Sequence, residues 1–381
     1  MLTETDLEEL TSFRRHLHQW PEISGEEEQT ARKVVEALSA LEPTRIIKGL
    51  GGHGVAAVFD SGMEGPTVLF RAELDALPIT EIHDIPWKSR VPGKGHLCGH
   101  EGHMTMLLAL GRLLHRQPVA RGRVVLMFQP AEEDGSGARA VVADPNFAAI
   151  APDYAFAIHL QPGLPYGHVA TKPGLINCAS QGLAIHLHGK TAHAADPEDG
   201  TSPAHTISTL VPALEALGKG GELNDDFRLA TVTHMTMGEP TFGIAPADGT
   251  LFVTLRSATD EGKVDMDKLA KAMATDLARK AGLEVCFETH DDFAASNNHP
   301  EAVDLARTSL DVLEIPHGEE CIPMRASEDF GVFGWSAKAA MLCMGPGEDY
   351  AALHNPDYDF PDDIIPIGAA LFERIARDLL G

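Results

Sequence analysis

The chain has 381 residues, of which 56 are acidic and 30 are basic, so its formal net charge at pH 7 is −26. This acidic surplus argues against a protein that binds nucleic acid through its phosphates. Hydrophobic residues make up 44% of the chain, which is enough for sizeable cores and argues against disorder. At roughly 100 to 200 residues per domain, the length predicts two or three domains. The N-terminal segment lacks the basic and apolar regions of a secretory signal, and no apolar run is long enough to cross a membrane, so we expect a cytoplasmic protein.

The first third of the chain alternates amphipathic helical segments with short apolar runs, a pattern typical of a parallel sheet with helices on both faces. Helices are expected over residues 7–17 and 104–114. A third helix is expected after Ser24, which would form a capping box with Glu27. Strands are expected over residues 54–59, 67–70, 123–128 and 154–158.

From about residue 177 the pattern changes. Apolar and polar side chains alternate, as in strands with one face in water, and the segments follow the order β-α-β-β-α-β of a ferredoxin-like domain. After about residue 291 the helical and buried-strand patterns return. The fold class that we expect is α/β, with a catalytic domain whose mostly parallel mixed sheet is flanked by helices. This domain would comprise residues 1–176 and 291–381, interrupted by an inserted α+β ferredoxin-like lid domain at residues 177–290.

The segment His96–His103 carries the strongest local signal for a metal site, because it offers a thiol and three imidazoles directly before a helix. Divalent borderline metals take thiolate, imidazole and carboxylate donors. The spacing of His100 and His103 is one residue too short for the zincin motif HExxH, which argues against a zincin. The cysteines of the chain form no CxxC pair, so further ligands must come from histidines and carboxylates.

Polar residues directly after an apolar strand are a second signal, because ligands bind outside the carboxyl ends of the strands in open α/β sheets. Expected strands lead into residues 71–75, into residues 129–133 and into His159, and a later strand leads toward His354. The adjacent Glu132 and Glu133 in the second of these segments would point in different directions if the strand geometry continues. One of them could then bind a metal while the other faces a substrate water.

Taken in order, these motifs resemble those of the M20 metallopeptidases over the whole chain. Within that family they resemble the amidohydrolase branch, which contains hippurate hydrolases, N-acyl amino-acid deacetylases and IAA-amino acid hydrolases. The matching stretches are residues 13–22, 70–78, 98–103, 128–133, 158–159, 189–195, 327–330 and 354–356. So many motifs in the right order make chance agreement negligible.

The resemblance implies an enzyme that cleaves the amide bond of N-acyl amino acids to a carboxylic acid and a free amino acid. It implies two divalent metal ions, with zinc, manganese, cobalt and nickel all open. Glu132 is the implied general base and acid, His193 would come from the lid to stabilise the oxyanion, and Asp75 would orient a metal ligand. The implied metal ligands are Cys98, His100, Glu133, His159 and His354, with Cys98 as the bridge between the ions.

Two positions depart from the family pattern, since Glu101 stands where the family usually has Asp and Gly243 where it usually has Asn. These departures keep open a binding protein on the same fold that has lost catalysis. A dipeptidase or aminopeptidase of the same family, and an amidase with Cys98 as its nucleophile, are further alternatives. Arg256 could grip a substrate carboxylate or form a structural salt bridge. The resemblance also implies a homodimer paired through the lid, with a small-molecule substrate and neither nucleic acid nor membrane as a partner.

Overall fold

The computed structural model describes residues 1–381, and these divide into two compact units. The first unit comprises Met1–Ile176, Ser296–Ile322 and Glu328–Gly381, and the second comprises Asn177–Ala295 with the short segment Pro323–Ser327. Each unit has a hydrophobic core of its own. None of the helices is both long enough and apolar enough to cross a lipid bilayer.

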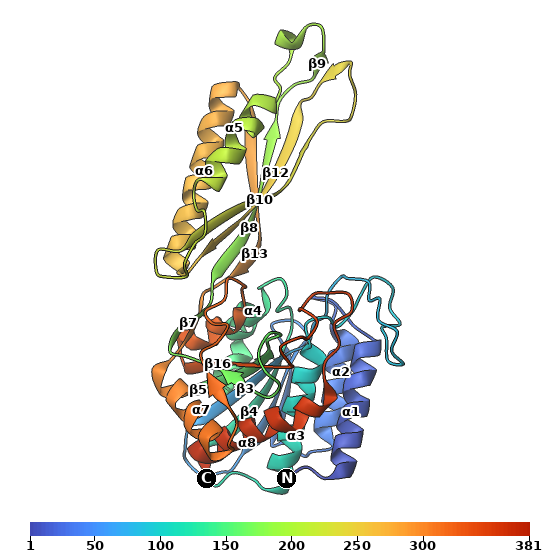
Figure 1. Ribbon diagram of the computed structural model, residues 1–381, viewed down its shortest axis with the longest axis vertical. Helices are drawn as coiled ribbons and strands as arrows, with labels where there is room; N and C mark the ends of the chain where they lie inside the picture. Colours follow the sequence, from blue (N-terminus) through green and yellow to red (C-terminus); the bar gives the residue numbers. More distant parts are fainter. The chain divides into compact units, whose positions relative to one another are not determined.

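The first unit is built on a mixed eight-stranded sheet with the order β1-β2-β4-β3-β5-β16-β6-β15. Figure 1 labels its strands β3, β4, β5 and β16. Its central strands β4, β3, β5 and β16 run parallel, while β1 and β2 pair antiparallel at one edge. Every residue of β3 is buried, which fits a strand covered on both faces. The strands are β1 (Arg45–Leu50), β2 (Gly54–Asp60), β3 (Thr67–Glu73), β4 (Arg123–Gln129), β5 (Tyr154–Leu160), β6 (Val169–Ala170), β15 (His317–Gly318) and β16 (Lys338–Met344).

Helices pack against this sheet, and one of them is buried along most of its length. This helix, α3, shares a single hydrophobic cluster with the sheet and with α1, α2, α7 and α8. A buried helix of this kind positions its first residues firmly, which matters for the site below. The helices are α1 (Glu4–Gln19), α2 (Glu28–Ser39), α3 (His100–Arg116), α4 (Gly137–Ala143), α7 (Pro300–Val312) and α8 (Ile365–Leu380).

The capping box predicted for Ser24 and Glu27 is wrong. The helix α2 begins at Glu28, and its N-cap residue Glu27 makes no side-chain capping bond. Ser24 instead donates its hydroxyl to Asp75, and Glu27 accepts from the backbone N–H of Ala131. Both side chains therefore tie the N-terminal segment to the loops that follow β3 and β4, and these long-range bonds replace the local cap.

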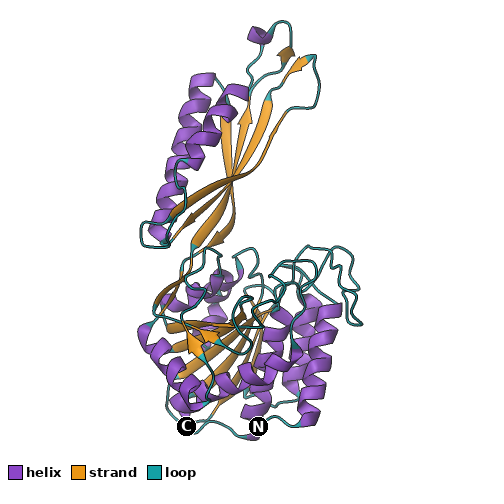
Figure 2. Cartoon of the chain, viewed as in Figure 1, coloured by secondary structure: helices purple, strands orange, loops and turns teal.

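The second unit is a four-stranded antiparallel sheet with the order β10-β12-β8-β13. In chain order its elements run β-α-β-β-α-β, and the first strand lies between the third and the fourth, as in ferredoxin-like domains. The helices α5 and α6 cover one face of this sheet (Figure 2). The elements are β8 (Ala179–His188), α5 (Ala204–Glu215), β10 (Arg228–Met237), β12 (Asp248–Ser257), α6 (Asp260–Ala281) and β13 (Glu284–Phe293).

Two further pairs of short strands complete the chain: β9 (Ala192–His193) with β11 (Ile244–Ala245), and β7 (Gly174–Asn177) with β14 (Ser296–Asn298). The predicted fold class is confirmed, since a mostly parallel sheet with helices is interrupted by an antiparallel α+β insertion. The predicted strands ended too early, because β3 and β4 continue into the polar residues Glu73 and Gln129.

Candidate active site and metal centre

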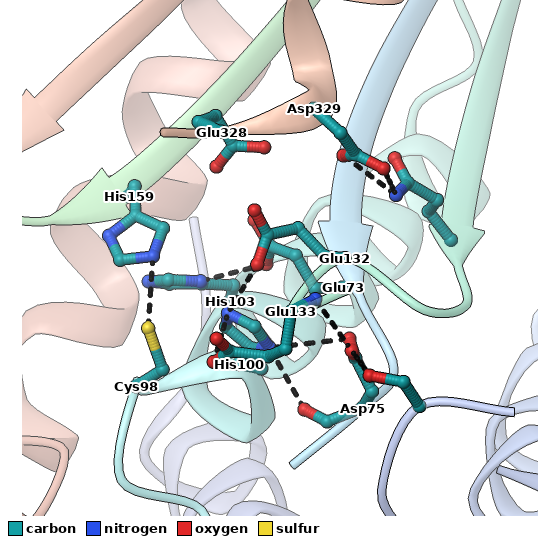
Figure 3. A network of polar contacts seen from close by, with 12 residues as sticks. Glu73, Asp75, Cys98, His100, His103, Glu132, Glu133, His159, Glu328 and Asp329 are labelled. Atoms are coloured by element: carbon teal, nitrogen blue, oxygen red, sulfur yellow. Dashed lines mark hydrogen bonds and ion pairs between the residues drawn. The ribbon is translucent and has the colours of Figure 1, made fainter. Parts of the chain in front are cut away.

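The site lies where three neighbouring strands end and the helix α3 begins (Figure 3). Because β3 pairs in parallel with both β4 and β5, the carboxyl ends of these strands meet at one edge of the sheet. Glu73 ends β3, Glu132 and Glu133 follow β4, and His159 lies near the end of β5. His100 is the first residue of α3. The strand-end pattern in the sequence thus points to one region of the structure.

Cys98 and His159 form the first pair of donors, with 3.4 Å between Sγ and Nε2. The other ring nitrogen of His159, Nδ1, lies 2.8 Å from the carbonyl oxygen of Leu160 and donates to it. The lone pair of His159 is therefore on Nε2 and faces the thiol. Burial and the carboxylates of Glu133 and Glu132 raise the pKa of Cys98. A thiolate at this position would need a positive charge beside it.

His100, Glu133 and His354 form a second group of donors. His100 donates from Nδ1 to the backbone carbonyl of Asp75 at 2.9 Å, so that its lone pair is on Nε2, 3.8 Å from Glu133 Oε1. Both of these atoms are buried and lack a hydrogen-bond partner. His354 Nε2 lies 3.5 Å from the other carboxylate oxygen of Glu133. Cys98, Glu133 and His354 together place donor atoms within 4.8 Å of one another, so Glu133 joins the two groups.

The backbone is strained at two positions of this site. Ala131, directly before Glu132, has φ +50°, and His354 has φ +66°, in the left-handed region that residues other than glycine seldom adopt. Hydrogen bonds hold both residues there, since Ala131 N–H donates to Glu27 and His354 N–H donates to the carbonyl of Leu97. Such strain persists where the surrounding structure enforces it, and it is common at functional sites.

Negative charge dominates the site. Glu132 lies within 4.8 Å of Glu328 and Asp329. The fully buried guanidinium of Arg71 contacts Glu73 and lies 2.8 Å from Glu328 and from Asp329. Burial and the neighbouring carboxylates, Glu328 first, raise the pKa of Glu132. One guanidinium does not balance this many buried carboxylates, and bound cations would relieve the imbalance.

Asp75 holds two donors at once. Its carboxylate accepts the backbone N–H of Glu133 at 2.9 Å and the hydroxyl of Ser24 at 2.7 Å, and its carbonyl accepts from His100. The side chain is completely buried. Asp75, which was predicted to orient a metal ligand, therefore contacts two of the predicted ligands, one through its backbone carbonyl and one through its carboxylate.

His103 lies among these donors, but both of its ring nitrogens are already used. Its Nε2 accepts the backbone N–H of Leu160 at 3.1 Å. Its Nδ1 must therefore carry the proton, which it donates to Glu73 at 2.9 Å. A histidine in this state has no lone pair left for a metal. We therefore interpret the hydrogen-bonded pair of Glu73 and His103 as a structural contact beside the site.

Glu101, one of the two departures from the family pattern, points away from these donors into a buried polar network. Its carboxylate accepts from His18 Nδ1 at 2.7 Å and lies 3.5 Å from Arg14. Arg14 in turn contacts Asp359 and Asp362, which follow His354 in the chain. Burial opposes ionisation of Glu101, but His18 outweighs it and lowers the pKa of Glu101 to about 2. The longer acid thus links α1 to the first turn of α3.

His193 and Arg256 belong to the second unit. The side chain of His193 is exposed, and its Nδ1 accepts the backbone N–H of Ala195 at 3.1 Å, which leaves the proton on Nε2. Arg256 donates to the carbonyl of Arg325 and to the hydroxyl of Ser327, at 3.0 and 2.9 Å. These contacts hold Arg256 within its own unit without a protein carboxylate, so they do not match the expected structural salt bridge. The other expected role, binding a substrate carboxylate, stays a prediction.

The sequence analysis assigned no role to several residues that shape the site. Arg71, Glu328 and Asp329 form a buried ion cluster against Glu132, although Glu328 and Asp329 are 195 or more residues away in the chain. The motif Ser327–Phe330 was the only signal for them, and it suggested no partner. Arg71 lies in the middle of an apolar strand, where a fully buried arginine itself indicates a paired carboxylate.

The chain is similar to known proteins over nearly its full length. Residues 69–378 match the model of peptidase family M20/M25/M40. The chain is 28% identical over 380 residues to hippurate hydrolase from Campylobacter jejuni, covering 98% of this chain and 97% of that protein. It is 30% identical to an IAA-amino acid hydrolase from Arabidopsis thaliana, covering 97% of this chain and 85% of that protein.

Among solved structures, a putative aminohydrolase from methicillin-resistant Staphylococcus aureus superposes with a TM-score of 0.87 at 25% identity, covering 99% of this chain and 98% of that one. Both the motifs and the fold therefore match over almost the full length. The chain belongs to peptidase family M20/M25/M40 and is an enzyme of its metal-dependent amidohydrolase and peptidase type.

Proposed function

We propose that this enzyme hydrolyses N-acyl amino acids, such as N-acetyl or N-benzoyl amino acids, to a carboxylic acid and a free amino acid. The observation that carries the proposal is the position of Glu132, which lies directly beside Glu133 and within 4.8 Å of both Glu133 and His100. The hippurate hydrolase and IAA-amino acid hydrolase relatives support the substrate class by their names.

The donors fit a pair of divalent ions, which Cys98, His100, Glu133, His159 and His354 would hold. The fit rests on two unpaired buried atoms, His100 Nε2 and Glu133 Oε1, and on histidine lone pairs that face the other donors. The mixture of thiol, imidazole and carboxylate suits zinc, manganese, cobalt or nickel. When bound, such ions lower the pKa of water and polarise an amide carbonyl.

Glu132 acts as the general base and then as the general acid. It is buried, and its raised pKa suits a carboxylate that takes a proton from the attacking water and then returns it to the leaving amine. Arg71 fixes the neighbouring Glu328 and Asp329, so Glu132 is held among rigid groups. These groups keep the carboxylate of Glu132 in one position for both proton transfers.

His193 supplies a hydrogen bond to the oxyanion of the tetrahedral intermediate. Its Nε2–H is free to donate, because Nδ1 accepts from Ala195. We further propose that the enzyme forms a homodimer through the second unit, in which β10 and β13 are the edge strands of an open sheet. Open edges of this kind pair readily with another strand.

Chelation tests the proposal. Metal-depleted enzyme should lose hydrolysis of N-acetyl and N-benzoyl amino acids and regain it when zinc, manganese, cobalt or nickel is added singly. Full activity after chelation, combined with inactivation by alkylation of Cys98, would support a cysteine nucleophile instead. Turnover of dipeptides alone would favour a peptidase of the same family. Full metal content without turnover of either substrate class would favour a binding protein.

A further inference from the structure

The loop that carries His354 is fixed by other segments rather than by secondary structure of its own. It lies between the strand β16, which ends at Met344, and the short helix η4 (Asp362–Ile364). About half of the His354 side chain is exposed, and its φ of +66° is in the left-handed region. Its Nε2 nevertheless lies 3.5 Å from the carboxylate of Glu133. Because no helix or strand fixes this residue, contacts with the rest of the first unit must hold it in position.

The same loop packs against the first turn of α3. Tyr358 and Phe360 are both buried. A Cβ atom added at Gly99 would come within 2.9 Å of the Tyr358 hydroxyl, and one added at Gly102 would overlap the ring of Phe360. The absence of side chains at these glycines therefore lets the loop approach α3 closely. The glycines flank the donor His100, so the loop and the donor-bearing turn of α3 are in direct contact.

Arg14 of α1 contacts both of these segments at once. Its guanidinium is completely buried. Nε donates to Asp362 and Nη1 donates to Asp359, each at 2.7 Å, and both aspartates lie shortly after His354 in the chain. Nη1 also lies 3.5 Å from the carboxylate of Glu101, in the first turn of α3. One side chain, from a helix that holds none of the five proposed metal ligands, thus joins two segments that do.

The planar fork of the guanidinium allows Arg14 to make these contacts simultaneously. An arginine presents five N–H groups in a fixed geometry, whereas a lysine carries a single ammonium group. A lysine at this position would keep the positive charge that the buried carboxylates require, but it could not hold them in the same arrangement. Each carboxylate also has a partner besides Arg14: His18 for Glu101, Trp87 for Asp359 and Arg15 for Asp362. The replacement R14K should therefore loosen the loop without unfolding the protein.

We propose that Arg14 is a positioning residue for His354. Through Asp359 and Asp362 it fixes the loop against α3, and this keeps the imidazole of His354 beside Glu133. Arg14 acts through His354 and not on an ion directly, since a guanidinium has no lone pair to offer a metal. This role rests on the proposed function, in which His354 is a metal ligand.

Hydrogen exchange of the metal-free, full-length protein tests the first step, the fixation of the loop. In R14K we expect backbone amides of residues 350–362 to exchange roughly 10-fold faster or more, as for the loss of one hydrogen bond to a charged group. R112K is the matched control, because Arg112 joins α3 to α1 through Asp6 and not through the loop. It should leave exchange in residues 350–362 as in the wild type. Unchanged exchange in R14K would overturn the proposal.

Zinc titration in competition with a chromophoric chelator tests the second step, the effect on His354. We expect H354Q to weaken one of the two zinc-binding steps. R14K should weaken the same step by roughly 10- to 100-fold, the usual effect of losing a residue that orients a ligand. Added to H354Q, R14K should lower zinc affinity by less than about twofold, because no imidazole remains for it to position. Additive losses in the double variant would overturn the proposal, since Arg14 would then act on the fold as a whole.

The two variants also separate failure of this role from failure of the proposed function. Normal zinc binding in R14K beside a loss in H354Q would overturn only the role of Arg14. Unchanged zinc binding in H354Q would show that His354 is not a ligand. That result would contradict the proposed ligand set, and with it the role of Arg14, even if exchange in R14K were faster.

Discussion

The two units contain similar Cys–His pairs in opposite surroundings. In the first unit, Cys98 and His159 are 3.4 Å apart in a buried pocket of carboxylates. In the second unit, Cys286 and His188 are 3.7 Å apart on an exposed face of a sheet. The distance between thiol and imidazole is therefore similar in the two pairs. The two pairs differ in burial. Burying carboxylates without enough cations costs free energy, whereas exposed groups are hydrated whether or not an ion binds.

This comparison predicts that only the buried site contains a residue on which turnover depends strongly. The variant E132Q keeps the size of the side chain but cannot accept a proton from water. We expect it to lower kcat by about 10² to 10⁴-fold, the range of general acid–base catalysis, while metal content stays near that of the wild type. Steady-state kinetics with metal analysis measures both. The matched variant E288Q on the lid should leave kcat unchanged, and a comparable loss in E288Q would contradict the comparison.

The residues that orient a histidine allow the two regions to be compared directly. Asp75 is completely buried and holds His100 and Glu133, whereas Asp248 is exposed and holds only His188. We expect D75N to weaken metal binding at the catalytic site by roughly 10- to 100-fold, the usual effect of losing such a partner. D248N should leave metal binding at the catalytic site unchanged, because Asp248 belongs to the second unit and water can replace an exposed acceptor. Metal titrations followed by activity measure the effect of both variants. Equal losses would show that burial does not set the strength of these contacts.

The two regions also differ in how well their donor residues could be predicted from the sequence. Cys98 and His100 are two residues apart at the start of a helix, so the motif was visible locally, and the strand ends supplied Glu133 and His159. The lid donors come from β8 and β13, which are about a hundred residues apart. Alternation from about residue 177 indicated strands with one hydrated face, but only the register of β13 shows that Cys286 lies opposite His186.

The same limit applies to the ion network behind the catalytic donors. Helix and strand positions followed from hydrophobic periodicity, because each depends on a few neighbouring residues. The contacts of Arg71 with Glu328, and of Glu101 with His18, join segments that only the folded sheet brings together. For Ser24 and Glu27 the sequence predicted a local capping box, but in the structure both side chains bond to residues far away in the chain. Sequence patterns therefore predicted the elements and the ligand-bearing motifs, but not the buried charge pairs that support them.

The smallest expected effect concerns stability in the network around Glu101. Burial lowers the pKa of His18, but the hydrogen bonds that His18 donates to Glu101 and Glu81 outweigh it and raise that pKa to about 9 from an ordinary value of 6.5. The protonated imidazole therefore stabilises the fold fully below pH 6.5, and this contribution disappears as the pH rises through 9. H18Q should lower the free energy of unfolding by about 1.5 to 3 kcal/mol at pH 6, the usual value of a hydrogen bond to a charged group, and by less at pH 9.5. Denaturant unfolding across this pH range, with the exposed His115 as the control variant H115Q, measures the difference. A deficit in H18Q that stays constant from pH 6 to pH 9.5 would mean that His18 is neutral in the folded protein and that packing alone explains its burial.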